Sequence, residues 1–203
     1  MPEIKICGIK NIEDINIVNQ LVPDYIGFVF AESKRKISPE KAKMLVSNLS
    51  NKIKIVGVFL DADIKFVKEV LNQVEIDIIQ LHGNEDMKYI LKLKEFFHGE
   101  IWKSVPVCNN FKGSFINKIP NDITLIFDSK KGGSGESFDW KKIKGISEKR
   151  KIVLAGGLNS NNIKMAIDIV KPQVVDVSSG VEKEGRKDLE KTEKFMRSVN
   201  NEF

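Results

Sequence analysis

Two residues of this chain, Cys7 and Asp128, have side chains that could move a proton on a small molecule. Each ends a short apolar run, with Gly8 after the cysteine and a glycine-rich segment, 130–137, after the aspartate. A thiol with a lowered pKa can act as a base or nucleophile near neutral pH. A partly buried carboxyl can stay protonated and act as an acid, or bind hydroxyls as a carboxylate. Alternatively, Cys7 is a small buried hydrophobe and Asp128 a solvated residue in a flexible connection.

Two later turns have the composition of a phosphate site. Gly156 and Gly157 follow an apolar run and precede a helical pattern, and Ser179 and Gly180 follow the last apolar run. Backbone amides in such turns can hold a phosphate, and in parallel barrels the loops after strands seven and eight often do so together. The alternative is that these are tight turns that need glycine for a positive φ.

Further candidates for substrate binding stand at other strand ends. Arg35 could pair with a carboxylate through its planar fork, although Lys34 and Lys36 beside it are also compatible with a solvated basic loop. Asp176 could contact a substrate or simply cap a turn. Gln80 and His82 end the fourth apolar run, and we include both as substrate-binding candidates.

We expect neither a metal nor an organic cofactor. A metal site would have to combine His82, Cys7 and carboxylates that lack any recognisable ligand spacing. The glycine-rich segment has neither the dinucleotide-binding fingerprint nor the P-loop spacing. Lys103 could form a Schiff base, but we expect it to pair with a carboxylate instead.

Eight apolar, β-branched runs alternate with amphipathic helical patterns along the chain. Eight repeated βα units predict either a closed parallel barrel or an open doubly wound sheet. Polar residues and glycines follow many of the runs instead of one switch point, which favours an α/β fold with a single (β/α)8 (TIM) barrel over residues 1–203 and an active site at its C-terminal face. The predicted strands are Glu3–Cys7, Tyr25–Phe30, Lys54–Leu60, Ile76–Leu81, Ile101–Val107, Ile123–Phe127, Ile152–Ala155 and Val174–Val177.

Helix starts are marked by side chains that can cap them. Ser38 precedes Pro39, a residue favoured in the first turn of a helix. Further capping candidates are Asp61 or Asp63, Asn84, and Ser160.

The composition fits a small-molecule enzyme. The 203 residues carry a net charge of +5, and the lysines are spread along the chain without a compact basic block, so nucleic-acid binding is not indicated. Mild basicity suits a small anionic substrate. No apolar run approaches the length of a membrane span, and two cysteines do not form a disulfide framework. We therefore expect a cytoplasmic protein without membrane or nucleic-acid partners, with its oligomeric state open between monomer and homodimer.

Six sequence blocks in order resemble the phosphoribosylanthranilate isomerase family of tryptophan biosynthesis. The blocks are KICG at 5–8, GFVF at 27–30 with SKR at 33–35, QLHG at 80–83, Asp128 with GGSG at 132–135 and FDW at 138–140, LAGGL at 154–158, and DVSSGVE at 176–182. One departure is Glu184, where family members often have proline.

The resemblance implies a (β/α)8 barrel that performs an Amadori rearrangement of a phosphorylated small molecule without metal or cofactor. It assigns Cys7 as general base, Asp128 as general acid and Arg35 as the partner of the anthranilate carboxylate. It also assigns the phosphate to the amides around Gly156, Gly157, Ser179 and Gly180. We further expect Cys7 and Asp128 to face each other across the barrel mouth, with Asp128 protonated, Cys7 readily ionised, and the segment 130–137 acting as a lid.

Other functions remain open at this point. Two related phosphosugar barrels are alternatives: the histidine-pathway aldose isomerase, which uses two aspartates, and indole-glycerol phosphate synthase, which uses lysines. A third alternative is a non-catalytic barrel that binds a phosphorylated ligand.

Overall fold

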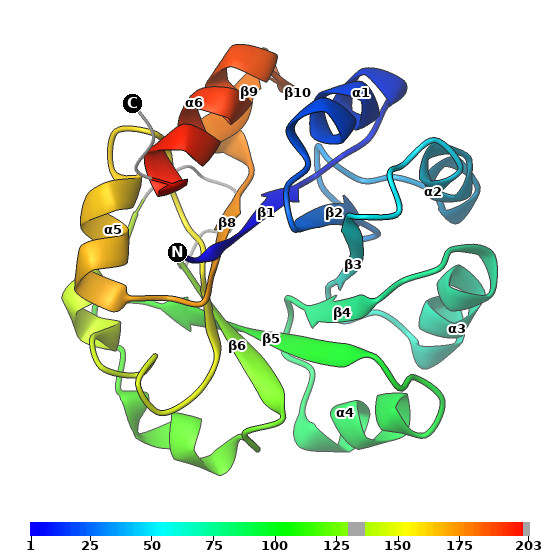
Figure 1. Cartoon of the computed structure of the whole chain (residues 1–203). Helices are drawn as coiled ribbons and strands as arrows, with labels where there is room; N and C mark the ends of the chain where they lie inside the picture. Colours follow the sequence, from blue (N-terminus) through cyan, green and yellow to red (C-terminus); the bar gives the residue numbers. More distant parts are fainter. Residues whose placement is uncertain (130–136, 201–203) are drawn as a thin grey trace.

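Eight parallel strands close into a barrel in the computed structural model, which describes residues 1–129 and 137–200 (Figure 1). Each strand pairs with the next in sequence, and β1 pairs with β8 to complete the ring. This confirms the predicted (β/α)8 barrel. The strands are β1 Glu3–Cys7, β2 Tyr25–Val29, β3 Lys54–Phe59, β4 Ile78–Leu81, β5 Glu100–Val107, β6 Ile123–Ser129, β7 Ile152–Leu154 and β8 Val174–Val177.

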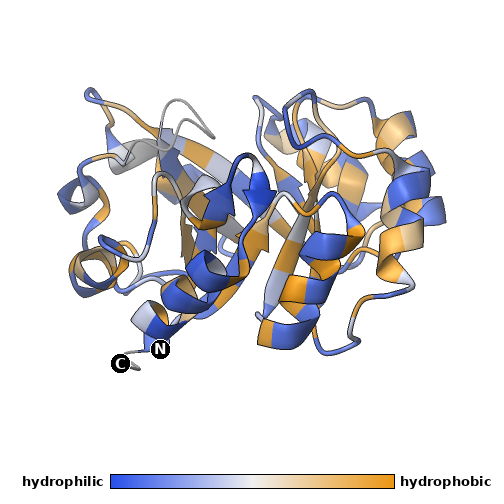
Figure 2. Cartoon of the chain, turned by 90° about the horizontal axis from the view of Figure 1, so that it is seen from above, coloured by the Kyte–Doolittle hydropathy of each residue, from blue (hydrophilic) through white to orange (hydrophobic). Residues whose placement is uncertain are grey.

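Helices surround the barrel in Figure 1. They are α1 Ile12–Leu21, α2 Pro39–Val46, α3 Ile64–Gln73, α4 Met87–Lys94, α5 Ile163–Val170 and α6 Leu189–Asn200. Short 3-10 helices, η1 Gly113–Lys118 and η2 Trp140–Ile143, lie in the connections after β5 and β6, and η3 Ser179–Val181 follows β8. The helices alternate hydrophobic and hydrophilic residues along their length (Figure 2), as expected for helices with one buried face.

The predicted helix caps are partly correct. Ser38 caps α2, and Asp63 caps α3 by accepting a hydrogen bond from the Lys65 amide. Asn84 does not cap α4, because that helix starts later and Asp86 accepts from the Tyr89 amide. Ser160 does not cap α5, which begins after Asn162.

A small hairpin follows η3 and holds residues of the barrel mouth. It consists of β9 Glu182–Lys183 and β10 Arg186–Lys187, which pair antiparallel. Its two turn residues have positive φ, 52° at Glu184 and 75° at Gly185, as a tight two-residue hairpin requires. Proline has its φ fixed near −65° and does not fit this turn. The departure at Glu184 is therefore consistent with the local hairpin.

The interior of the barrel has an apolar middle layer, with polar side chains toward both of its ends. One buried cluster fills this middle layer with inward-facing side chains, including Tyr25, Val56, Trp102 and Ile126. The rings of Tyr25 and Trp102 meet edge to face at 5.3 Å. A second, larger cluster packs the outside of the strands against the helices. Polar side chains lie at the amino ends of the strands too, where the Tyr25 hydroxyl donates to Glu3 and the Thr124 hydroxyl donates to Glu100.

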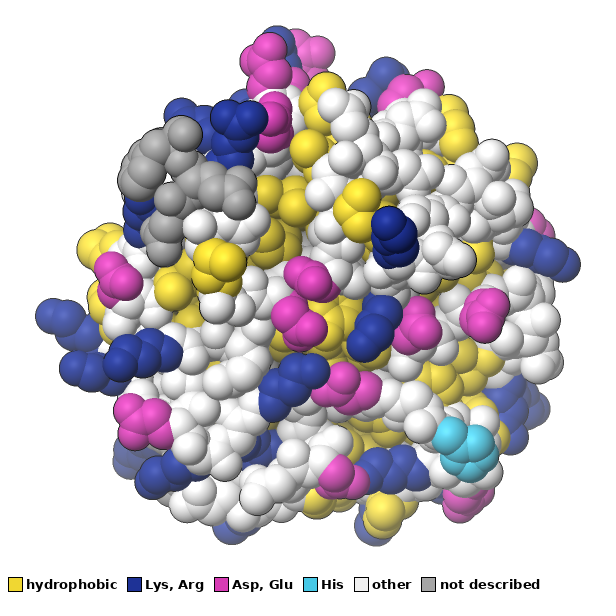
Figure 3. Space-filling model, viewed as in Figure 1, with side chains coloured by type: hydrophobic (Ala, Val, Ile, Leu, Met, Phe, Trp, Pro, Cys, Tyr) yellow, Lys and Arg dark blue, Asp and Glu magenta, His cyan; other side chains and the backbone are white. Residues whose placement is uncertain are grey.

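The surface has no single-sign patch on the face shown in Figure 3, where basic and acidic side chains are interspersed. In the described part of the chain, no helix is long and apolar enough to cross a membrane.

Candidate functional site

A cavity of about 220 Å³ opens at the carboxyl ends of the strands. Its walls come from β1, β2, β3, β4, β6 and β8 and from the loops that follow β2, β3, β4, β7 and β8. The predicted site residues that line it are Cys7, Arg35, Gln80, His82, Asp128, Gly156, Gly157, Asp176 and Ser179. Gly180 lies behind this wall, where a Cβ would come within 2.0 Å of the Leu158 carbonyl oxygen.

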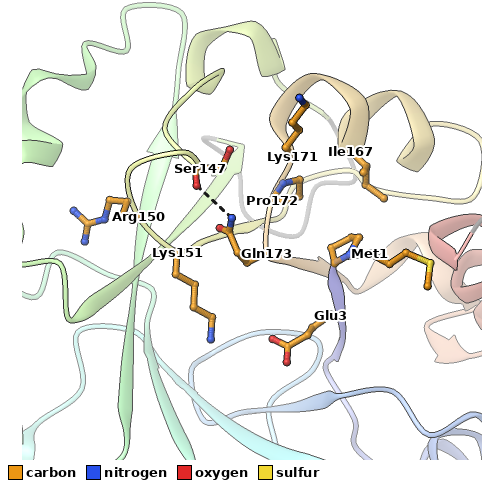
Figure 4. A pocket seen from close by; sticks show the side chains of 10 residues that line it. Met1, Glu3, Ser147, Arg150, Lys151, Ile167, Lys171, Pro172 and Gln173 are labelled. Carbon is orange, nitrogen blue, oxygen red and sulfur yellow. Dashed lines mark hydrogen bonds between the residues drawn. The ribbon is translucent and has the colours of Figure 1, made fainter.

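A second hollow lies at the opposite end of the barrel and contains none of these residues. It is lined by residues at the amino-terminal ends of β1, β7 and β8, such as Glu3, Lys151 and Gln173 (Figure 4). There the Gln173 amide donates to the Ser147 carbonyl at 3.3 Å. The predicted chemistry is therefore gathered at one end only.

Asp128 is buried at the end of β6. Burial raises the pKa of this carboxyl, although His82 and the Ser129 amide favour the ionised form. Oδ1 accepts from the Ser129 amide at 2.7 Å, and Oδ2 lies 3.6 Å from Nε2 of His82. The raised pKa agrees in direction with the hypothesis of a protonated Asp128.

Gln80 and His82 stand beside Asp128 on the fourth strand and its loop. Nε2 of Gln80 lies 3.3 Å from Nδ1 of His82. When Gln80 donates to Nδ1, the ring carries its proton on Nε2, the atom that faces Asp128. Gln80 can therefore fix the tautomer in which His82 directs a hydrogen-bond donor at this carboxyl.

Cys7 is enclosed at the end of β1, and both cysteines of the chain are free. Burial raises the pKa of the Cys7 thiol, with Asp176 acting in the same direction and Lys5 and Lys187 acting against them. This differs from the hypothesis of a readily ionised thiol, because desolvation of the thiolate outweighs the two lysines.

Arg35 crosses the barrel mouth above Gly8. Its Nε and Nη2 donate to the two carboxylate oxygens of Glu182 at 2.7 and 2.8 Å. A Cβ at Gly8, whose φ is +85°, would lie 2.4 Å from Cδ of Arg35. Lys34 and Lys36 are exposed, so the solvated-loop interpretation fits them and does not fit Arg35.

The two glycine turns border the same cavity. Gly156 and Gly157 have φ of +85° and +64°, and a Cβ at Gly156 would lie 2.8 Å from Oδ1 of Asp128. The turn after β7 therefore needs glycine for its backbone conformation, and it also brings main chain without a side chain next to the buried acid.

Lys103 pairs with a carboxylate, as predicted. Its Nζ lies 2.8 Å from Oε2 of Glu85 and 2.5 Å from the Gly83 carbonyl oxygen. Among the described residues, no group of three or more His, Cys, Asp or Glu side chains is arranged to hold a metal ion.

Sequence reasoning missed four polar residues that surround Cys7 and Arg35. Lys5 pairs with Asp176, Lys187 pairs with Glu182, and the Ser178 hydroxyl donates to the Cys7 carbonyl at 2.9 Å. Lys5 stands two residues before Cys7 on one strand, so the alternation of β1 could have placed both on the inner face.

A closed parallel barrel with a polar cavity at the carboxyl ends of its strands defines the chain as a (β/α)8-barrel enzyme. The family model of N-(5'phosphoribosyl)anthranilate (PRA) isomerase matches residues 4–198. The chain therefore belongs to the N-(5'-phosphoribosyl)anthranilate isomerase family.

Individual relatives support this membership over the full length. The N-(5'-phosphoribosyl)anthranilate isomerase of Clostridium acetobutylicum is 46% identical, with 98% of each chain covered. That of Clostridium kluyveri is 44% identical, with 99% of each covered. The crystal structure of phosphoribosyl anthranilate isomerase from Thermotoga maritima superposes with a TM-score of 0.89 at 36% identity, covering 99% of this chain and 100% of that one.

One related structure contains a ligand. A phosphoribosyl anthranilate isomerase in complex with reduced 1-(o-carboxyphenylamino)-1-deoxyribulose 5-phosphate superposes with a TM-score of 0.85 at 34% identity, covering 99% of this chain and 100% of that chain.

Proposed function

We propose that Cys7 and Asp128 perform, as general base and general acid, the isomerisation of N-(5'-phosphoribosyl)anthranilate to 1-(2-carboxyphenylamino)-1-deoxyribulose 5-phosphate in tryptophan biosynthesis. The observation that carries this assignment is that a thiol on β1 and a buried carboxyl on β6 line one cavity. The family membership supplies the reaction, and the side chains present in the cavity fit its steps.

The reaction needs an acid first. A proton delivered to the ring oxygen of the ribose breaks its bond to C1, and the nitrogen lone pair forms an iminium. Asp128 suits this step because burial raises the pKa of its carboxyl, which favours the protonated form that a general acid needs. His82 and the Ser129 amide then stabilise the carboxylate that remains.

A base completes the rearrangement. Removal of the proton from C2 leaves its electron pair to form the C1–C2 double bond, which neutralises the iminium and gives an enolamine. Protonation at C1 and loss of the hydroxyl proton at C2 then give the ketone. Cys7 as the thiolate can accept the C2 proton from the side of the cavity formed by β1.

The two anionic groups of the substrate have separate partners in this proposal. Arg35 faces the cavity from the loop after β2 and can bind the anthranilate carboxylate, and the amides around Gly156, Gly157, Ser179 and Gly180 can bind the phosphate. Gln80, His82 and Asp176 complete the wall and can bind the sugar hydroxyls. The lid predicted at 130–137 lies, from 130 to 136, outside the described residues.

The cellular setting is proposed from the same reasoning. A small phosphorylated substrate, mild basicity and two free cysteines suit a cytoplasmic enzyme that needs no nucleic acid or membrane partner.

A fluorescence assay tests the acid and the base. Substrate made in situ is mixed with wild-type protein, Cys7→Ala or Asp128→Asn, and the loss of anthranilate fluorescence is followed. We expect each variant to lose about 10²–10⁴-fold in kcat, the usual contribution of acid–base catalysis, with a smaller change in KM. Cys108→Ala is the matched control, because Cys108 lies outside the cavity and bonds Asn110. Turnover within tenfold of wild type in either variant would overturn that residue's role.

A further inference from the structure

Lys5 is fully buried inside the barrel, at 0% exposure, on the strand that carries Cys7. Lysine is almost never fully buried unless its charge is paired. Here its Nζ donates to Oδ2 of Asp176 on β8 at 2.9 Å. The register of the barrel places the two residues directly opposite each other on β1 and β8.

The ammonium group of Lys5 lies close to the thiol of Cys7. Gly27 stands opposite Cys7 on β2, and its missing side chain leaves room for both groups. A Cβ at Gly27 would lie 2.8 Å from Sγ of Cys7 and 3.2 Å from Nζ of Lys5, so the two groups lie within about 6 Å of each other. Lys5, Cys7 and Asp176 therefore form one cluster, in which Cys7 and Asp176 line the cavity and Lys5 lies fully buried behind them.

Packing alone does not account for this lysine. Neighbouring inward-facing positions are filled by apolar side chains, and an apolar replacement of a buried ion pair often leaves a protein as stable or more stable. Asp176 also keeps Oδ1 buried with no hydrogen-bond partner among the described residues. The ion pair thus costs desolvation without satisfying all of its polar atoms, which indicates a role beyond stability.

The charged groups that act on Cys7 come from four elements. They are Lys5 on β1, Asp176 on β8, Lys187 on β10, and Arg35 in the loop after β2. Both Arg35 and Lys187 bind Glu182, whose carboxylate offsets their charge. Lys5 differs from Arg35 and Lys187 because its ammonium group lies inside the barrel, next to the thiol.

We propose that Lys5 is a positioning residue that keeps the thiolate of Cys7 available for proton abstraction, and that Asp176 holds the Lys5 ammonium in place. This inference rests on the proposed role of Cys7 as the general base. Lys5 retains its own proton throughout, and the proton from C2 of the substrate goes to Sγ of Cys7.

The direction of the electrostatics supports this role. Burial lowers the pKa of Lys5, but attraction to Asp176 and Cys7 outweighs it, so that the pKa is raised and the ammonium stays charged. Burial raises the pKa of Cys7, and Lys5 is the largest influence that lowers it. Without Lys5, the thiolate would face Asp176 with less compensation.

Alkylation of the thiol tests the proposal without using catalysis. In a Cys108→Ala background, the rate of reaction with iodoacetamide is measured against pH, since only the thiolate reacts. We expect Lys5→Met to raise the midpoint by about one pH unit or more, which lowers the thiolate fraction at neutral pH about tenfold. Lys5→Arg keeps the charge and should stay closer to wild type.

The direction in which the alkylation midpoint moves distinguishes loss of the Lys5 charge from a loosened barrel. A loosened barrel would admit water to Cys7 and lower the midpoint, whereas loss of the cation raises it. If Lys5→Met does not fold, Lys5→Met/Asp176→Asn is compared with Asp176→Asn, because the double variant leaves no uncompensated charge at these two positions. The double variant should again have the higher midpoint.

Two results would overturn the proposal: an unchanged or lowered midpoint in Lys5→Met, or, where that variant does not fold, the same midpoint in the two Asp176→Asn proteins. Failure of the underlying role of Cys7 looks different, since Cys7→Ala would then retain turnover whatever the midpoint in the lysine variants. Steady-state kinetics add a further readout, with kcat of Lys5→Met falling about tenfold at neutral pH and recovering as pH rises.

Discussion

At the scale of single residues, Glu182 binds two cationic side chains at the barrel mouth, Arg35 and Lys187. Its carboxylate accepts two hydrogen bonds from Arg35 and one from Lys187, whose Nζ lies 2.8 Å from Oε1. Burial raises the pKa of Glu182, but Arg35 and Lys187 outweigh burial and lower the pKa to about 2. The folded protein therefore holds this group ionised far below its ordinary pKa of 4.5.

This depressed pKa predicts a pH-dependent stability. A carboxyl whose pKa is lower in the folded state stabilises the fold above its unfolded pKa, and the contribution is lost as pH falls from about 4.5 toward 2. We expect Glu182→Gln to cost about 1–3 kcal/mol of unfolding free energy at pH 7, the value of hydrogen bonds to charged groups, and less as the pH drops through that window. Urea unfolding from pH 3 to 7 measures this.

Glu184→Gln is the matched control for this prediction, because Glu184 is exposed in the same hairpin. It should follow the wild-type curve across the whole pH range. A constant difference between wild type and Glu182→Gln down to pH 3 would show that the ionisation of Glu182 does not produce the effect.

At the scale of elements, the sequence predicted where strands occur better than where they end. β1 and β8 have the predicted bounds, because turn residues follow both directly. β6 runs on to Ser129 because Asp128 and Ser129 pair with Pro106 and Val107 of β5, a contact that no local pattern encodes. The sequence predicted that Asp128 follows the strand, whereas it is the next-to-last residue of β6.

The candidate site shows the same limit. Residues at strand ends could be found from their position, but their partners could not, since Lys5 and Asp176 are 171 residues apart and Arg35 and Glu182 are 147 apart. Closure of β1 on β8 and the hairpin after η3 bring these pairs together. The sequence therefore predicted candidate side chains of the cavity wall, but it did not predict the ion pairs that fix their charge and position.

Close contact between the two glycine turns gives a prediction at this scale. A Cβ at Gly180 would lie 2.0 Å from the carbonyl oxygen of Leu158, a backbone atom of the loop after β7. We expect Gly180→Ala to separate the two loops and cost about 1–3 kcal/mol, the usual penalty of overpacking. In a chain of this size that lowers Tm by about 2–12 °C, measured by thermal unfolding.

Gly113→Ala provides the comparison, since a Cβ there meets nothing closer than 3.7 Å. It should unfold within about 0.5 kcal/mol of wild type, as surface changes usually do. Equal Tm values for the two alanine variants would contradict a packed contact between the loops.

At the scale of the whole molecule, closure makes every strand depend on its two neighbours. The barrel has no free edge, because β1 pairs with both β2 and β8. Apolar residues fill its interior below the cavity and a second apolar layer joins it to the helices. Loss of any one strand opens both layers to water, so the barrel is expected to unfold as a unit.

The two tryptophans allow the predicted single domain at 1–203 to be tested. Trp102 lies in the barrel interior and Trp140 in the outer layer at η2, and both are buried. Trp140→Phe and Trp102→Phe variants each leave one fluorescent probe. We expect the urea midpoints of both probes to coincide with that of far-UV circular dichroism, because one cooperative transition moves all three signals together. An outer layer that melts first, with Trp102 still buried, would divide the chain into two cooperative units and contradict the single domain.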